Sequence, residues 1–150
     1  MRKILGWAAI AAIILWAAAF FILKSTHDRV TEEMLAVAAQ MRVPSGWTLE
    51  DENVEREKLI CLNANPCPSL SRTWQTDTEL DPESLRNLAA SAGWAVQLEG
   101  DCSRPSGAIG RRSVCSGHTI DGGYEVTLRV DSPDEGAPSQ FWLHLEASGE

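Results

Sequence analysis

The chain has 150 residues, 44% of them hydrophobic, and a formal net charge of −8 at pH 7. This acidic surplus argues against nucleic acid as a partner and against electrostatic binding to anionic lipid headgroups, because both carry negative charge. The part that follows the first 43 residues is long enough for one small domain with one core, which disulfides would help to stabilise.

The chain begins with an uncharged apolar run, residues 4–23, between Arg2-Lys3 and Lys24. As a helix this run would span roughly 30 Å, the thickness of the hydrocarbon core of a bilayer. Its many Ile, Leu and Phe side chains favour insertion into lipid. The sequence therefore predicts a cytoplasmic tail at 1–3, a single transmembrane anchor at 4–23 and a membrane-proximal helix or linker at 24–43.

A cleaved secretory signal is the alternative to an anchor. Residues 17–19 are three alanines and resemble a signal-peptidase site, so cleavage near Ala19 would release a secreted domain. Against this alternative, the apolar run continues through Phe20 and Phe21 up to Lys24. We therefore favour the uncleaved anchor.

The four cysteines decide the orientation, because basic residues flank the apolar run on both sides. Their spacings, C-x5-C and C-x12-C, lack the short pairs that zinc sites use, so we expect no metal and no cofactor. Two disulfides in an oxidising compartment are the better interpretation, with the pairing left open. The domain at 44–150 is then extracytoplasmic and the N-terminus cytoplasmic. The cysteines are Cys61, Cys67, Cys102 and Cys115.

Elements of the domain follow in order. Residues 25–41 have helical periodicity and either form a second helix or extend the membrane helix. Pro44 and Gly46 end this helical stretch, and an extended segment with several charges runs from 47 to 61. Residues 70–76 predict a second strand.

The clearest helix of the domain lies at 82–92. Asp81 is the expected N-cap, Pro82 occupies the first helical position, and Gly93 ends the helix. A third strand is predicted to follow at once, from 94 to 99, by alternation of apolar and polar residues.

A hairpin is predicted near the C-terminus. Strands at 112–120 and 124–130 flank Asp121-Gly122-Gly123, a sequence typical of tight hairpin turns. An acidic loop at 131–139 and a last strand at 141–146 complete the chain. The predicted fold class is α+β, with a mainly antiparallel sheet and one or two helices.

One internal similarity suggests duplication. Gly46-Trp47 and Gly93-Trp94 each follow a helix and precede a strand, a cysteine, a loop, a second cysteine and another strand. The unit would be helix-strand-strand, repeated once. A glycine helix cap followed by an apolar residue explains each Gly-Trp locally as well, so convergence stays open.

Catalytic candidates are few. His118 lies close in sequence to Ser116 and Asp121, from which a hydrolase site could be drawn. No G-x-S-x-G sequence supports Ser116 as a nucleophile, so an exposed strand histidine is the simpler interpretation.

Tryptophan supplies the candidate contact residues. Trp47 and Trp94 follow glycines at strand starts and are expected in the core. Trp142 shares its strand face with polar residues and is expected to be exposed, which makes it the leading candidate for contact with a ligand. Trp74 and Arg72 are the secondary candidates.

Two motifs carry a resemblance: P-x-G-W-T-L at 44–49 and C-P-S-L-S-R-T-W at 67–74. With the N-terminal anchor and the second cysteine pair, they resemble small single-pass envelope proteins of high-GC Gram-positive (actinobacterial) type. That resemblance implies a location in the cell envelope and no site residues. We expect a membrane-anchored, non-enzymatic module that binds a protein or a wall component. The alternatives are a small extracytoplasmic hydrolase using His118 and an accessory subunit that acts through its transmembrane helix.

Overall fold

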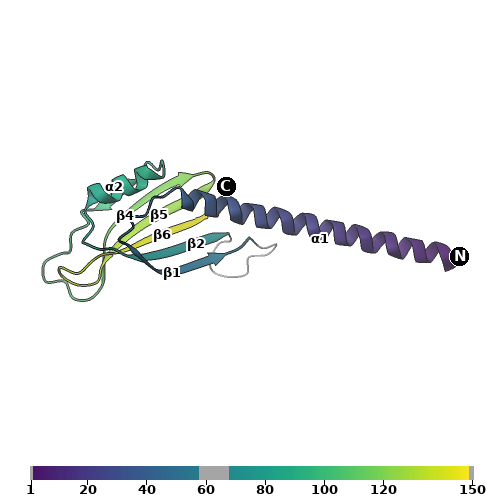
Figure 1. The fold of residues 1–150 in the computed structure, drawn as a ribbon, viewed down its shortest axis with the longest axis horizontal. Coiled ribbons are helices and arrows are strands. Elements are labelled where there is room, and N and C mark those ends of the chain that lie inside the picture. The colour runs from purple at the N-terminus through teal and green to yellow at the C-terminus, as the bar shows by residue number, and fades with distance from the viewer. Residues whose placement is uncertain (1, 58–67, 149–150) are drawn as a thin grey trace.

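The computed structural model describes the backbone of residues 2–57 and 68–148, and the side chains within these ranges except 2–12, 23 and 27. Two helices and six strands form one α+β domain with a long N-terminal helix that projects from it (Figure 1). The elements are α1 (Arg2–Ala39), β1 (Thr48–Glu55), β2 (Ser69–Gln75), α2 (Pro82–Ser91), β3 (Gln97–Gly100), β4 (Arg112–Asp121), β5 (Tyr124–Ser132) and β6 (Gln140–Ala147).

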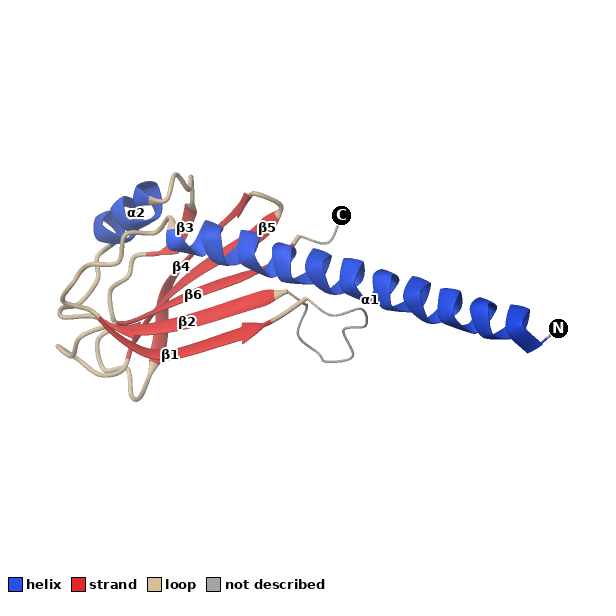
Figure 2. Cartoon of the chain, turned by 45° about the vertical axis from the view of Figure 1, so that its right-hand side comes forward, coloured by secondary structure: helices blue, strands red, loops and turns tan. Residues whose placement is uncertain are grey.

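The sheet is antiparallel throughout, with the order β1-β2-β6-β5-β4-β3. The last strand of the chain, β6, therefore lies in the middle of the sheet, between β2 and β5 (Figure 2). The predicted α+β class with an antiparallel sheet is confirmed. The two helix-strand-strand units correspond to the two outer hairpins, β1-β2 and β3-β4, and the structure adds two central strands that belong to neither unit.

Alternation of side chains explains why one face of this sheet is the core face. Over 125–130 in β5 and 141–146 in β6 every second residue is apolar and fully buried, while the residues between them are partly exposed and, apart from Trp142, polar. The buried residues of both helices join the same apolar cluster, so both helices cover this face. The central members from the strands are Val126, Leu128, Val130, Phe141, Leu143 and Leu145.

Helix α1 is continuous over 38 residues, roughly 57 Å. Residues 25–39 therefore extend the N-terminal helix and do not form a separate second helix. Its C-terminal section packs on the sheet, with Thr31 and Met34 almost completely buried and Val37 and Ala38 beside them. One side of α1 from Thr31 onward therefore belongs to the core of the domain. The N-terminal section of α1 leaves the domain and points away from it (Figures 1 and 2).

Helix α2 forms as the sequence predicts. The Oδ1 atom of Asp81 accepts hydrogen bonds from the backbone N–H groups of Glu83 (2.8 Å) and Ser84 (2.9 Å). These bonds, above all the one from Ser84, hold the pKa of the Asp81 carboxyl below its ordinary value. At the other end Gly93 has φ +80°, a conformation that favours glycine, and the chain leaves the helix there.

Three strand boundaries differ from the prediction by more than one residue. The extended segment predicted at 47–61 forms strand β1 only up to Glu55. The third strand begins at Gln97 and not at Trp94, because the Trp94 N–H still bonds to the carbonyl of Ala89 at the end of α2. The fifth strand extends to Ser132, because Asp131 pairs with Gln140 across β5 and β6. The predicted loop at 131–139 is shorter for that reason.

Contacts between α1 and the β4-β5 turn define what we call the proximal end of the sheet. The Tyr124 hydroxyl donates to the carbonyl of Val30 (2.9 Å), and a Cβ on Gly122 would lie 3.3 Å from Val37. Gly122 and Gly123 both have positive φ, as a two-residue hairpin turn requires. The opposite, distal end carries the loops that follow β2, β3 and β5 (Figure 1).

One disulfide is present among the described residues, between Cys102 and Cys115, whose Cα atoms are 4.6 Å apart. This pair confirms the disulfide prediction for the second half of the chain. The predicted role of Cys61 and Cys67 lies outside the described residues.

Candidate binding surface

The face of the sheet opposite the helices, which we call the open face, is polar. Within the residues that the structure describes, the two helices lie on the other face and no further helix covers this one. Cross-strand pairing aligns its side chains in two rows near the middle of the sheet. One row is Asp51, Thr73, Trp142, Arg129, Ser116 and Glu99, and the other is Asn53, Ser71, His144, Thr127, His118 and Gln97.

Trp142 lies near the centre of the open face, as its strand alternation predicts, but it is only partly exposed. The guanidinium of Arg129, its cross-strand partner, lies 4.1 Å from the centroid of the indole ring. Arg129 also forms an ion pair with Asp131, with Nε and Oδ1 3.1 Å apart. The guanidinium of Arg129 thus covers the indole, and the Asp131 carboxylate holds this guanidinium in place.

Four buried polar atoms around this tryptophan lack a hydrogen bond within the described chain, although two of them, Arg129 Nε and Asp131 Oδ1, form the ion pair with each other. They belong to two adjacent cross-strand pairs, Arg129 with Trp142 and Asp131 with Gln140. Buried polar atoms without partners are costly and are uncommon in structural scaffolds. Gln140 Oε1 and Trp142 Nε1 have neither a hydrogen bond nor an ion pair among the described residues, which makes the surroundings of Trp142 the strongest candidate for ligand contact on this face. The atoms are Arg129 Nε, Asp131 Oδ1, Gln140 Oε1 and Trp142 Nε1.

The secondary candidates lie on the other face of the sheet. Trp74 is 6% exposed and its indole packs against Phe141, with ring centroids 5.7 Å apart. Arg72 is on the same face and forms an ion pair with Glu52 of β1. Neither side chain lies beside Trp142, because neighbouring residues of a strand point to opposite faces.

Of the two tryptophans that follow glycines, Trp94 has the core position predicted for it, whereas Trp47 packs against the core and is partly exposed. Trp94 is buried and its Nε1 donates to Oδ2 of Asp121 over 3.2 Å. Trp47 is partly buried against Phe141, with ring centroids 5.4 Å apart.

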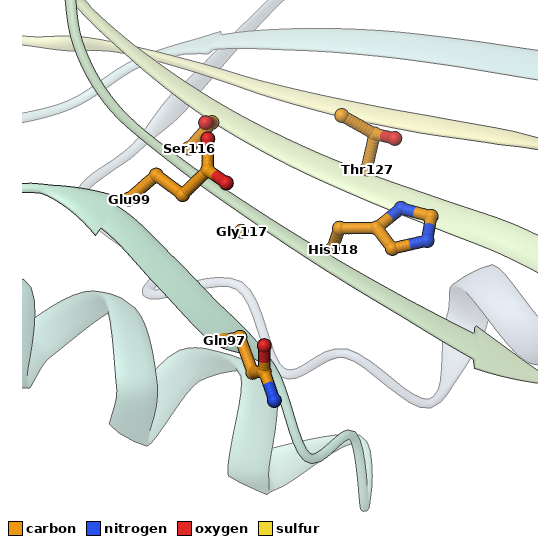
Figure 3. Close-up of a pocket in the computed structure, with 6 residues that line it drawn as sticks. All are labelled: Gln97, Glu99, Ser116, Gly117, His118 and Thr127. Atoms are coloured by element: carbon orange, nitrogen blue, oxygen red, sulfur yellow. The ribbon is translucent and has the colours of Figure 1, made fainter.

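His118 lines a hollow of about 200 Å³ on the open face beside β3 (Figure 3). Its side chain is 54% exposed and its Nδ1 lies 3.5 Å from a carboxylate oxygen of Glu125. Figure 3 shows the imidazole pointing away from Ser116, whose hydroxyl lies near Glu99 instead. Asp121, the third residue of the hydrolase alternative, is engaged by Trp94. The structure does not bring these groups together as a catalytic triad requires.

The other histidine of the open face, His144, is partly buried and also lies near a carboxylate. His144 Nε2 lies 3.3 Å from a carboxylate oxygen of Glu146 on the same strand. Among the described side chains, no three His, Cys, Asp or Glu residues are arranged to hold a metal ion.

A structured loop at the distal end was not recognised as a candidate from the sequence. Residues 103–114, which we call the disulfide loop, lie between Cys102 and Cys115. The side chain of Arg104 donates to the carbonyls of Ala108, Gly110 and Ser132, each over 2.8 or 2.9 Å. The loop thereby holds Ile109 at 87% exposure, above every other large hydrophobic residue whose side chain is described. The signal available in the sequence was an isoleucine beside Arg111-Arg112 within a cysteine-closed loop.

Comparison with protein-family models, with curated proteins and with solved structures finds no match for this chain. Among the described side chains, no helix has an apolar stretch of the length needed to cross a membrane.

Proposed function

We propose that this chain is a membrane-anchored interaction module of the cell envelope, with its N-terminus in the cytoplasm and its α+β domain outside. The apolar run at 4–23 would be the anchor, and the open face around Trp142 and Arg129 would be the binding surface. The proposal includes no catalytic step.

The exposed side chains of α1 carry this proposal. Ile13, Ile14, Leu15 and Trp16 are consecutive and are 62–76% exposed, so they face all sides of the helix. Phe20, Phe21 and Ile22 continue the pattern one turn later. A helix that is apolar on every side needs lipid or protein around it, because water disfavours such a surface. The run extends in sequence to residues 4–12 and 23, whose side chains lie outside those described.

The charge distribution and the disulfide support the orientation. Beyond the apolar run the chain has 11 basic and 21 acidic residues, a formal charge of −10, which disfavours close contact with an anionic membrane surface. Disulfides such as Cys102–Cys115 persist in oxidising compartments and are rare in the cytosol.

The continuous helix α1 gives the module a defined geometry. The last residue of the apolar run, 23, and Thr31, the first buried residue among the described side chains, are eight residues apart on one helix, about 12 Å. The proximal end of the sheet would lie near the membrane and the distal loops would face away from it.

Thiol labelling in intact cells tests the orientation. A membrane-impermeant maleimide should label Cys102 and Cys115 only after treatment with an impermeant reductant, because both thiols are in a disulfide. Peptide mass spectrometry of the product reports labelling at each cysteine, and a cytoplasmic protein with exposed thiols is the control. Labelling that requires cell lysis would place the domain in the cytoplasm and contradict the proposal.

A further inference from the structure

We propose that the tip of the disulfide loop docks on strand β1 of a second copy of this chain, so that copies assemble side by side in the membrane. The inference rests on the proposed function in one respect, since a common anchor would hold the copies parallel.

The tip of the loop has the composition of a contact surface. Ile109 is 87% exposed and is followed closely by Arg111 and Arg112, which are exposed as well. Neither arginine has a carboxylate partner among the described residues, whereas Arg72 and Arg129 both have one. An exposed isoleucine between polar groups gains from burial in an interface, and the unpaired arginines favour an acidic partner.

The loop is also held in one conformation. The disulfide joins its ends, and the three carbonyls bound by Arg104 connect its two sides with the end of β5. A rigid loop loses little conformational freedom on binding, which is the main cost that flexible loops carry.

Strand β1 provides the complementary surface. It is one of the two edge strands of the described sheet, the other being β3, and its residues from Thr48 to Asn53 are all exposed. Leu49 is 48% exposed and is followed by three acidic residues, of which Asp51 has no cationic partner among the described residues. A symmetric pairing of two β1 edges would bring these carboxylates together, so the acidic edge favours a basic partner.

The start of β1 and the end of the disulfide loop lie at the same level of the sheet, on β1 and β4. Cross-strand pairing links Thr48 through Gln75, Gln140 and Asp131 to Ser113, so the start of β1 and the end of the disulfide loop share one row of the sheet. Four strand spacings separate them, roughly 19 Å. A copy placed beside another in the same orientation therefore brings the end of this loop near the start of β1 of the next copy. The row of Asp51 ends at Glu99, so Arg111 meets Asp51 when one copy is shifted along the strands by about four residues, roughly 13 Å. Such a head-to-tail contact propagates into a ring or a row.

Photo-crosslinking in native membranes tests this contact. The full chain carries Ile109→p-benzoylphenylalanine, and the matched control carries the same residue in place of Ile120, an exposed isoleucine at the proximal end. We expect adducts of two and more copies of the 16.4 kDa chain from position 109 and at least tenfold fewer from position 120. Mass spectrometry should place the cross-link within residues 48–53 of the second copy.

Charge reversal separates a specific contact from chance proximity. R111E and D51R should each reduce the adduct from position 109 at least fivefold, and the two together should restore it, because the ion pair is then reversed. Equal thermal unfolding curves for these variants and the wild type show that the fold is intact.

The inference is overturned by adducts to a different protein or to lipid, by a cross-link outside β1, by equal yields from positions 109 and 120, or by no recovery in the double variant. Alkaline extraction of the same membranes tests the anchor separately. A chain that stays in the membrane pellet but forms no adducts refutes the contact between copies alone. A chain that is extracted but still forms adducts refutes the anchor alone.

Discussion

The N-terminal and C-terminal sections of helix α1 have the same backbone conformation and opposite surroundings. In the C-terminal section a single side of the helix is buried, with Met34 fully enclosed by the sheet and Glu33 beside it exposed. In the N-terminal section the described apolar side chains point outward on every side, with Trp16 76% exposed. The pattern of apolar residues, and not their number, therefore distinguishes a helix that packs on a domain from one that requires an apolar environment around it.

The largest expected effect is on the free energy of unfolding, and it is tested by one substitution in each section of α1. Met34→Asp would bury an unpaired carboxylate in the core and should lower the free energy of unfolding by more than about 4 kcal/mol. The matched substitution Phe21→Asp lies at an exposed position and should leave unfolding of the domain unchanged. Near-ultraviolet circular dichroism during thermal unfolding of the full chain in detergent measures both. Equal destabilisation by the two would show that the N-terminal section of α1 also packs on the domain.

Loss of the disulfide should have the next largest effect. Replacing both Cys102 and Cys115 with serine opens a loop with a sequence separation of 13, and should cost about 3 kcal/mol of stability. Chemical unfolding in detergent measures the change. Because this loop lies in the domain, retention of the chain in membranes should not change, and a loss of retention would contradict the independence of the domain and the N-terminal section of α1.

Tyr124 connects the sheet to α1 and should show a smaller effect that depends on pH. Tyr124→Phe removes the hydrogen bond to Val30 and should cost about 1 kcal/mol near pH 7. Burial, with the nearby Glu33 and Glu57 carboxylates, raises the pKa of this hydroxyl above its ordinary value of 10.0. Above pH 10 the unfolded state therefore loses the proton first, so the stability of the wild type should fall as pH rises through this range.

The slope of stability against pH between pH 9 and 11 checks this behaviour. Tyr124→Phe should have the shallower slope, because it removes the group that titrates. Equal slopes in the two proteins would assign the alkaline transition to another group.

The smallest effect concerns the open face. Arg129→Gln combined with Asp131→Asn removes the cation over Trp142 together with the buried carboxylate that pairs with it, and should cost about 0.5–1 kcal/mol, with a change in tryptophan fluorescence as the indole gains exposure. Arg129→Lys keeps the charge and is the matched control. An unchanged emission spectrum in the double variant would show that the guanidinium does not cover the ring in solution.

Local signals predicted most of the fold. Asp81 and Pro82 mark the start of α2, and the paired glycines at 122 and 123 mark the β4-β5 turn, because each acts through its own backbone. The order of the strands was not available from such signals. The position of β6 between β2 and β5 depends on which apolar faces fill one core, and this is a property of the whole chain.

The candidate surface was predicted only partially. Trp142 was assigned to a polar face from strand alternation, and the structure places it there. Alternation of neighbours also shows why Trp74 cannot share that face, since Thr73 is the cross-strand partner of Trp142 and Trp74 follows it. The exposure of Ile109 depends on bonds from Arg104 to residues up to 28 positions away, and no local pattern reports them.

Alkaline extraction of native membranes tests most directly whether the N-terminal section of α1 lies in lipid. Ile13→Asp with Ala17→Asp adds two charges near the middle of the apolar run and should disfavour insertion by roughly 5–7 kcal/mol. The control, Ala36→Asp with Gln40→Asp, places the same charges at the same spacing on exposed positions of the C-terminal section of α1 and of the turn after it. We predict that the wild type and the control stay in the membrane pellet and that I13D/A17D is released. Release of the wild type, or retention of I13D/A17D, would contradict a membrane anchor.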